Sequence, residues 1–506
     1  MQRLRHLVVV VPGIGGSVLS RADGTPAWAT TRSRLAGALL RPGGLDLEQA
    51  PDLEPTGLIS TFTAVGGLLH LQGYEGLENQ LRRTFRDPVV HSYRRGVPIP
   101  RNVDVLLFPY DFRRSLRIAA VALADAINQA LAEITESARR KRVIVIAHSM
   151  GGLVARYWLG PLGGAPLCAA LLTLGTPHRG APKALDWLVN GAGIGRLRLP
   201  WVTRVLRGWP SVYELLPQYP AVWDGEARAE LELAHLPPGM IARRPRLGRY
   251  RQAFASRAAD GRRTHEEIAD AWAALPPGEV PVVPYFGRGH PTRNRMEMSP
   301  SGRLTISKAD PDWRGNVGWQ GDGTVPALSA IPRELGEVRS SWRGVADRHG
   351  DFASTAAVLD LLVSFTGDVM PTRGSERPER PWLGLDVEDA VPSGEPVLVG
   401  VVVQPAGFDA EAVHVTLTNV GDPSVPEYGE WLVRGGDEWR GLLPALSAGR
   451  YGLAVEAQRV SGPESVFARV DLVVLDPDAE AEAVAGTTVD TEVGDIDVEE
   501  QADVRA

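Results

Sequence analysis

The stretch from residue 143 to residue 159 constrains the fold more than any other part of the chain. Residues 143–146 are β-branched and apolar, as expected for a strand buried on both faces. The sequence Ala-His-Ser-Met-Gly-Gly follows and leads into a helix-like pattern. Ser149 lies between the predicted strand and helix, with the small residues Ala147 and Gly151 two positions away on either side. This arrangement is typical of a strained turn that presents a nucleophile, so we predict that Ser149 is one. An ordinary turn with an unreactive serine is the alternative.

Similar apolar runs recur along the chain and predict the other strands of the same sheet. They are residues 7–11, 103–108, 169–174, 280–286 and, more weakly, 338–342. Helical patterns separate several of these runs, notably over residues 116–140. This alternation predicts an α/β fold with a doubly wound parallel sheet. A segment rich in Trp, Arg and Pro, about residues 184–274, interrupts the alternation and is predicted to form an inserted cap or lid.

The character of the sequence changes after residue 370. Residues 371–381 form a polar, Pro-rich segment that predicts a linker. Residues 382–476 contain short β-rich runs separated by turn residues, which predicts a small immunoglobulin-like β-sandwich. Residues 477–506 contain ten acidic residues and one Arg, and we expect a disordered tail. The catalytic domain would then span residues 1–370, and we expect the β domain to be dispensable for the chemistry.

Charge and cysteine content exclude several classes of protein. The tail carries a charge of −9 and the whole chain −7, so the rest is near neutral and has no basic field for nucleic acid. The single cysteine, Cys168, excludes an internal disulfide. The apolar run at residues 7–11 is short for a signal peptide, and no stretch approaches the roughly 20 apolar residues of a membrane span. We therefore expect a cytoplasmic protein with no nucleic-acid partner.

A serine nucleophile requires a base and a carboxylate that orients the base, and these groups come later in the chain. Asp322 lies in a Gly-Asp-Gly-Thr-Val-Pro sequence after the run at residues 280–286. His349 follows the last predicted strand. We predict that Asp322 orients His349 and that His349 acts as general base and acid. The alternatives are Asp312, Asp347 and Asp351 for the carboxylate, and His178 and His290 for the base.

A Gly-rich loop at residues 11–17 follows the first predicted strand and lets backbone approach a substrate closely. It lacks the Lys of a phosphate-binding P-loop and the spacing of a dinucleotide fingerprint. An oxyanion hole needs two backbone N–H donors, one of which belongs to the residue after the nucleophile. We predict that these donors are Met150 and Ile14, with Gly15 as the alternative to Ile14.

Five motifs occur together in one order: Val-Val-Val-Pro-Gly-Ile-Gly-Gly-Ser, Pro-Tyr-Asp-Phe-Arg, Ala-His-Ser-Met-Gly-Gly, Gly-Thr-Pro and Gly-Asp-Gly-Thr-Val-Pro. Over about residues 7–365 this order resembles the lecithin:cholesterol acyltransferase-like family, which includes lysosomal phospholipase A2 and phospholipid:diacylglycerol acyltransferase. The resemblance implies an α/β-hydrolase fold with a cap and a mobile lid. It also implies acyl-enzyme chemistry on ester lipids through Ser149, Asp322 and His349, with no metal or other cofactor. Phe112 departs from the family, which usually has Trp at this position.

Three features near the expected site have a functional and a structural interpretation. One helical face in the cap segment suits either a lid that contacts lipid or a packed cap helix; its residues are Trp201, Val202, Val205, Leu206 and Trp209. Residues 243–263 contain eight Arg and one acid, which fits either anionic head groups or a solvated, ion-paired face. Asp111 and Arg113 would either support the catalytic loops or form a structural ion pair.

Three functions remain open from the sequence. The first is a serine esterase or lipase that acts on carboxylic ester lipids. The second is an O-acyltransferase, in which an alcohol instead of water takes the acyl group from the enzyme. The third is an inactive hydrolase fold that serves as an interaction module. The expected partner is an ester lipid substrate, with transient contact to a lipid surface. A protein partner of the β domain cannot be identified from the sequence.

Overall fold

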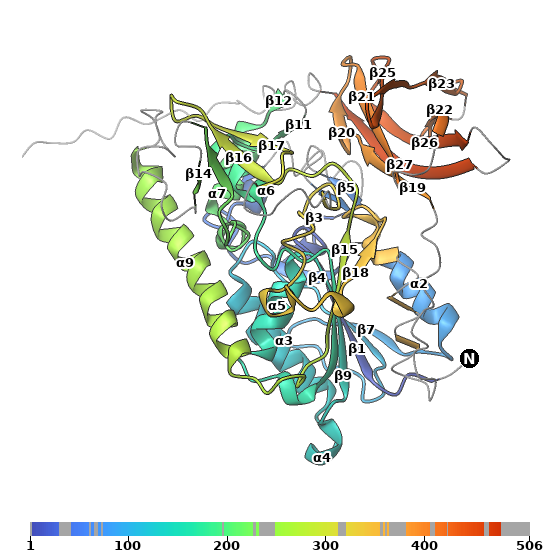
Figure 1. The fold of residues 1–506 in the computed structure, drawn as a ribbon. Helices are drawn as coiled ribbons and strands as arrows, with labels where there is room; N and C mark the ends of the chain where they lie inside the picture. The colour runs from blue at the N-terminus through green and yellow to red at the C-terminus, as the bar shows by residue number, and fades with distance from the viewer. Residues whose placement is uncertain are drawn as a thin grey trace, which may run out of the picture.

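The computed structural model describes residues 3–29, 42–59, 62–64, 69–71, 74–194, 197–225, 229–231, 248–311, 320–354, 358–359, 362–363, 381–404, 410–422, 424–459 and 465–476 (Figure 1). A seven-stranded sheet in the order β18-β15-β10-β9-β1-β8-β7 lies at its centre, and every neighbouring pair is parallel. Its strands are β1 (Leu7–Val11), β7 (Val90–Ser92), β8 (Val105–Leu107), β9 (Val143–His148), β10 (Cys168–Leu174), β15 (Val282–Gly287) and β18 (Arg343–Val345).

Helices cover both faces of this sheet, because its strands are apolar on both sides. The helices α3 (Leu116–Ala130) and α5 (Met150–Leu159) bury their apolar residues on one face. The helix α2 (Glu75–Thr84) and the 3₁₀ turn η8 (Asp351–Ser354) lie on the other, where Leu77, Leu81 and Phe352 pack together. The structure confirms the predicted doubly wound α/β fold.

Two predicted elements were wrong in their bounds. The last strand was predicted at residues 338–342, but a 3₁₀ turn, η7 (Arg339–Ser341), lies there and β18 begins at Arg343. The Trp342 indole donates to the carbonyl of Leu335 and so holds this segment as a turn. The helix predicted over residues 116–140 ends at Ala130, and the short α4 (Glu136–Arg139) follows a turn. The Arg139 guanidinium donates to the carbonyls of Ala132 and Ile134 within that turn.

The described part of the cap segment contains four helices that pack around the central domain. They are α6 (Pro182–Val189), α7 (Pro200–Gly208), α8 (Pro210–Tyr213) and the long α9 (Gly248–Ala273), which runs along one flank in Figure 1. Small sheets accompany them: β11 (Gly193–Ile194) with β12 (Leu197–Arg198), and β13 (Val222–Asp224) and β14 (Ala229–Leu231) with β16 (Arg295–Met298) and β17 (Leu304–Ser307). No helix in the described part of the chain is long and apolar enough to cross a membrane.

The N-terminal half adds small antiparallel elements beside the central sheet. They are β2 (Ser17–Ser20), β3 (Pro26–Trp28) and β4 (Glu54–Leu58) in one sheet, β5 (Phe62–Ala64) with β6 (Leu69–Leu71), and the 3₁₀ turn η1 (Pro42–Leu45). Further 3₁₀ turns are η2 (Ala165–Leu167) and η6 (Arg333–Leu335). The first of these sheets continues directly from the Gly-rich loop after β1, so it helps to fix that loop.

The C-terminal residues form two sheets around a hydrophobic cluster of their own. One sheet has the order β19-β21-β25-β24, with β19 (Trp382–Asp386), β21 (Val397–Gln404), β25 (Glu438–Leu443) and β24 (Val433–Gly435). The other has the order β20-β27-β26-β22-β23, with β20 (Ala390–Pro392), β27 (Ser465–Leu475), β26 (Gly449–Arg459), β22 (Ala410–Asn419) and β23 (Tyr428–Trp431). Figure 1 places this β domain near β15 and β18. The predicted tail, and the predicted linker apart from Pro381, lie outside the described residues.

Candidate active site

Ser149 occupies a sharp turn between β9 and α5, with φ of 50° and ψ of −127°. A non-glycine residue in this region is strained and persists only where its surroundings hold it. The surroundings leave no space for side chains: a Cβ on Gly151 would lie 2.5 Å from the carbonyl oxygens of Val11 and Pro12. A Cβ on Gly152 would lie 2.0 Å from Thr176 Oγ1. The turn therefore presents Ser149 at the carboxyl edge of the sheet.

The structure brings three of the predicted site residues together. Ser149 Oγ lies 3.0 Å from His349 Nε2, and His349 Nδ1 lies 2.8 Å from Asp322 Oδ2. All three side chains are buried. The second carboxylate oxygen of Asp322 accepts backbone N–H groups from Thr324 at 2.9 Å and Val325 at 2.6 Å. The loop around Asp322 is therefore folded around its carboxylate.

The surroundings of Asp322 favour its ionised form. Burial alone would raise the pKa of this carboxyl, but the charge and hydrogen bond of His349 and the two amides outweigh burial and lower the pKa. The ionised Asp322 accepts the Nδ1–H of His349. The lone pair of a neutral His349 ring is then on Nε2, which faces the Ser149 hydroxyl.

The Gly-rich loop after β1 lies directly against the turn at Ser149. A Cβ on Gly13 would lie 2.8 Å from the Ser149 Cβ, so only glycine fits at this position. Ile14 and Met150 are both buried beside it. Met150 begins α5, so the helix itself does not use its N–H. Among the described residues, none accepts a hydrogen bond from the Ile14 amide. Both predicted oxyanion donors thus lie on the segments that meet at Ser149.

A buried bridge of side chains joins these segments, and the sequence analysis missed it. The Gly13 N–H donates to the Tyr74 hydroxyl at 2.9 Å, and that hydroxyl lies 2.9 Å from His148 Nδ1. His148 Nε2 lies 2.9 Å from the backbone oxygen of His349, so Nε2 carries the proton and Nδ1 accepts from Tyr74. Burial, together with the charge of His349, lowers the pKa of His148 to about 3. The bridge therefore connects the Gly-rich loop, the turn at Ser149 and the His349 loop.

The alternative acids and bases lie elsewhere or outside the described residues. His178 is 3.2 Å from Thr173 Oγ1, and His290 Nε2 donates to the carbonyl of Ala346. Neither ring contacts Ser149 in the described structure. Asp347 and Asp351 flank His349 in the chain, but Asp322 is the carboxylate within hydrogen-bond distance of its ring. Asp312 lies outside the described residues.

The predicted lid face is packed inside the protein in this structure. Val205, Leu206 and Trp209 are buried, and Trp201 is half-buried. The Trp209 indole donates to the carbonyl of Leu45 at 3.0 Å and its ring meets Phe112 edge-on, with centroids 5.5 Å apart. This is the packed-cap arrangement, because an apolar face is more stable in the core than in water.

The ion pair of Asp111 and Arg113 is also structural. Both guanidinium nitrogens Nε and Nη2 donate to the two oxygens of Asp111 at 2.8 Å, and Arg113 is fully buried. Arg113 Nη1 donates to the carbonyl of Ala50 at 2.8 Å and so fixes the segment after η1.

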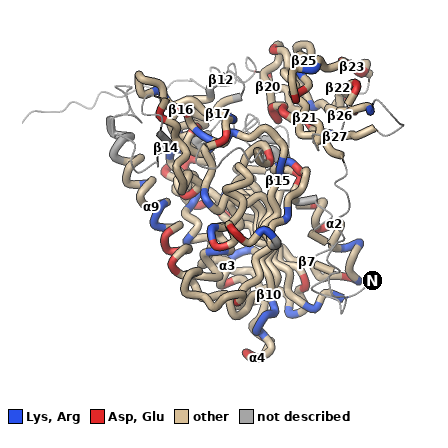
Figure 2. The backbone as a smooth tube through the Cα atoms, viewed as in Figure 1, with Lys and Arg blue, Asp and Glu red and all other residues tan. Residues whose placement is uncertain are grey.

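In the Arg-rich segment, the described residues of α9 include ion pairs such as Arg263 with Asp260, and Figure 2 shows both signs of charge along that helix.

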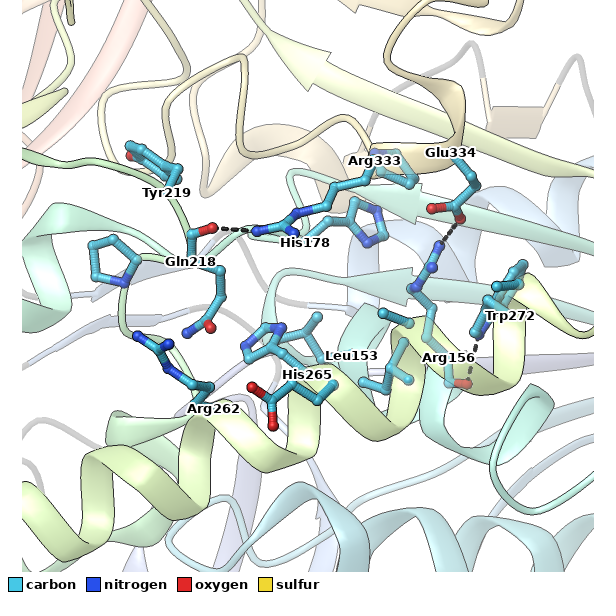
Figure 3. A pocket seen from close by; sticks show the side chains of 16 residues that line it. Leu153, Arg156, His178, Gln218, Tyr219, Arg262, His265, Trp272, Arg333 and Glu334 are labelled. Atoms are coloured by element: carbon cyan, nitrogen blue, oxygen red, sulfur yellow. Dashed lines mark hydrogen bonds and ion pairs between the residues drawn. The ribbon is translucent and has the colours of Figure 1, made fainter. Parts of the chain in front are cut away.

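A separate pocket of about 380 Å³ lies between α5 and α9 (Figure 3). Its lining includes Arg156, His178, His265 and Arg333, and none of the three candidate catalytic residues. Arg156 pairs with Glu334 at 2.5 Å and lies 4.0 Å above the Trp272 ring. Arg333 donates to the Gln218 carbonyl, so Arg156 and Arg333 of this pocket already have partners. Within the described residues, no group of three or more His, Cys, Asp or Glu side chains could hold a metal ion.

Comparison with known proteins finds a family similarity over part of the chain. Residues 89–244 match the family model of lecithin:cholesterol acyltransferase. This part of the chain is similar to that family, and the parallel sheet is that of an α/β-hydrolase fold. The match supports an ester-hydrolysing or acyl-transferring enzyme. Ser149 lies inside the matched residues, whereas Ile14, Asp322 and His349 lie outside them. No curated protein matches the chain.

Solved structures similar to this α/β-hydrolase include Bacillus licheniformis lipase BlEst2. Its mature form has a TM-score of 0.31 at 13% identity, with 72% of this chain and 92% of that chain covered. Its propeptide form has a TM-score of 0.32 at 10% identity, covering 92% and 93% of the two chains. CopC from Methylosinus trichosporium OB3b has a TM-score of 0.16 at 17% identity, covering 19% of this chain and 96% of that one.

Proposed function

We propose that this enzyme is a serine esterase or lipase that cleaves carboxylic esters of lipids through an acyl-enzyme on Ser149. The observation that carries the proposal is the continuous hydrogen-bond chain from Ser149 through His349 to Asp322 at a strained strand-to-helix turn. A serine hydroxyl is a weak nucleophile until an oriented base removes its proton. The lipid nature of the ester is inferred from the family.

In the first half-reaction, Ser149 Oγ attacks the ester carbonyl carbon while His349 Nε2 takes its proton. The carbonyl oxygen becomes negatively charged and accepts hydrogen bonds from the N–H groups of Ile14 and Met150. Collapse of this intermediate breaks the bond to the alkoxy group, which leaves as an alcohol after it receives the proton from His349. Asp322 remains ionised and stabilises the charged ring of His349.

In the second half-reaction, water replaces the alcohol. His349 removes a proton from the water as it attacks the acyl carbon, and the acid product leaves when Ser149 regains its proton. If an alcohol attacks instead of water, the same steps transfer the acyl group to it. The family match favours this O-acyltransferase activity as the second candidate, because the matching family is named for acyl transfer.

Labelling with a fluorophosphonate probe and turnover of a p-nitrophenyl ester test the proposal. Ser149→Ala should abolish labelling and lower turnover by about 10⁴- to 10⁶-fold. Ser211→Ala is the matched control, since it also removes a buried hydroxyl, one that donates to the Phe112 carbonyl at 2.6 Å. Labelling of Ser149→Ala at the native rate would refute the assignment. Measuring acid and ester products with and without a long-chain alcohol then separates hydrolysis from transfer.

A further inference from the structure

The first strand of the β domain lies against a loop next to the candidate catalytic residues. A Cβ on Gly289 would lie 1.9 Å from the Trp382 ring, and one on Gly384 would lie 2.1 Å from the Gly289 carbonyl oxygen. The two chain segments therefore meet backbone to backbone. The Leu385 N–H donates to His290 Nδ1 at 3.1 Å, and His290 Nε2 donates to the Ala346 carbonyl at 2.7 Å. One imidazole thus ties the β domain to the segment that leads to His349.

The same loop reaches the carboxylate that orients the base. His290 forms isolated backbone bridges with Gly321 and Asp322, and its N–H donates to the Gly321 carbonyl at 3.2 Å. A Cβ on Gly287 would lie 2.4 Å from the Asp322 Cβ. The His349 N–H in turn donates to the Asp322 carbonyl at 3.0 Å. The loops that carry Asp322 and His349 are therefore joined by backbone contacts to the segment that contacts β19.

An acidic turn begins at the last residue of β19 and contacts cations of the catalytic domain. This turn, residues 386–389, contains Asp386, Glu388 and Asp389. Its three carboxylates pair with three side chains from the other domain: Asp386 with Lys308, Glu388 with Arg293 at 2.7 Å, and Asp389 with Arg348 at 2.9 Å.

A fourth cation lies close to the same turn. Burial and then the charge of Arg293 lower the pKa of Lys183, while Asp389 and Glu388 act in the opposite direction. Charge complementarity of this kind fixes the register of an interface.

Among these cations, Arg348 lies nearest in the chain to the candidate catalytic base, because it directly precedes His349. Its guanidinium donates to the Val387 carbonyl at 2.9 Å in addition to its pair with Asp389. Arg348 and Asp389 are 11% and 14% exposed, so water screens their attraction less than it does for a surface pair. Asp389 is itself held by its backbone, since its carbonyl accepts the Val473 N–H at 3.0 Å.

We propose that the acidic turn of the β domain positions the loop of the catalytic base, through Arg348, and that the β domain is part of the functional active site. Arg348, Asp389 and His290 are positioning residues in this scheme, since none of them contacts Ser149. The scheme replaces the sequence-based expectation that the β domain is dispensable for chemistry. It rests on the proposed function, because it assigns a support to the His349 base.

Asp389→Asn tests the proposal in the full-length chain, since it removes the charge and keeps the size of the side chain. A shift of a catalytic group by about 1 Å lowers turnover by up to about 10²-fold. We therefore expect kcat on a soluble short-chain ester to fall by roughly 10- to 100-fold, with KM changed by less than about 3-fold. Asp471→Asn is the matched control, because it breaks a pair with Arg450 at 3.1 Å inside the β domain. Its kcat should stay native.

A double-mutant cycle separates positioning from stability. Arg348→Gln should lower kcat as Asp389→Asn does, the double variant should be no worse than either, and Arg348→Lys should retain more activity than Arg348→Gln. The proposal is overturned if the melting temperature of Asp389→Asn falls while kcat per probe-labelled site, measured well below that temperature, stays native. If Asp389→Asn behaves in this way while Ser149→Ala is inactive, only the role of the β domain is refuted and the proposed function stands. An active Ser149→Ala would refute the proposed function itself.

Discussion

Replacing Tyr74 with Phe would remove a single buried hydroxyl that serves two partners. The Gly13 N–H and His148 Nδ1 both bond to this hydroxyl at 2.9 Å, and all three groups are buried. The substitution leaves each partner without a hydrogen bond, and an unsatisfied buried group costs about 1–3 kcal/mol. The expected loss of unfolding free energy is then about 2–6 kcal/mol. At roughly 2–4 °C per kcal/mol, the value for domains of about 150–250 residues, the melting temperature should fall by about 4–24 °C.

The same change should also slow the chemistry, because Gly13 precedes the candidate oxyanion donor Ile14. Loss of a complete oxyanion donor lowers kcat by about 10²- to 10³-fold. Tyr74 holds the Gly-rich loop through the Gly13 N–H but is not itself an oxyanion donor. We therefore expect a decrease of about 10-fold in kcat with KM nearly unchanged. Calorimetry and turnover of a short-chain p-nitrophenyl ester measure the two effects.

Tyr110→Phe is the internal comparison, because the Tyr110 hydroxyl donates to the Pro12 carbonyl of the same loop at 2.9 Å. It leaves one unsatisfied acceptor instead of two groups, so its loss of stability should be about half as large. A Tyr74→Phe variant that melts within about 1 °C of the native protein and keeps its kcat would refute the reasoning. A lower melting temperature with native kcat would show that the bridge supports the fold but not the oxyanion loop.

Two further predictions concern acid pH and the cap. Stability should fall as the pH drops from about 6.5 towards 4, because burial lowers the folded-state pKa of His148 to about 3 and of His265 and His290 to about 4, from 6.5. The unfolded chain takes up these protons first, so each histidine contributes a loss of roughly 2 kcal/mol by about pH 5, and His265→Gln should flatten the pH dependence of the melting temperature. Trp209→Ser should lower the melting temperature and reduce activity equally on soluble and micellar esters, since Trp209 packs on Phe112. A loss confined to micellar esters would instead show that this face contacts lipid.

The inner strands of the central sheet were predictable because they are apolar on both faces. β1, β9 and β10 are continuous buried runs, and the predicted residues and the observed strands nearly coincide. The edge strand β18, with the sequence Arg-Gly-Val, is mostly exposed and therefore has no such signal. β7 is equally short and half-buried, and the sequence analysis missed it. A strand could therefore be predicted from the sequence where it is buried on both faces, and not from strand propensity alone.

The candidate site was predictable only where its residues lie in local motifs. Ser149, Asp322 and His349 each follow a predicted strand, so the topology brings them to one edge. Tyr74 has no local signature, and its contact with His148 joins residues 74 positions apart. The contact between His290 and Leu385 spans 95 positions. Such pairs depend on the complete packing of the chain, which no short pattern encodes.

The conformation of Ser149 has a consequence for how such a chain could change over generations. Its φ of 50° destabilises every folded molecule by about 1–3 kcal/mol, whether or not it ever meets a substrate. Glycine would relieve this strain without any other rearrangement, since it adopts positive φ freely. A lineage that used the fold only as a scaffold would gain stability from that single replacement. Serine at this position is therefore unfavourable for folding, and its presence fits the proposed catalytic role.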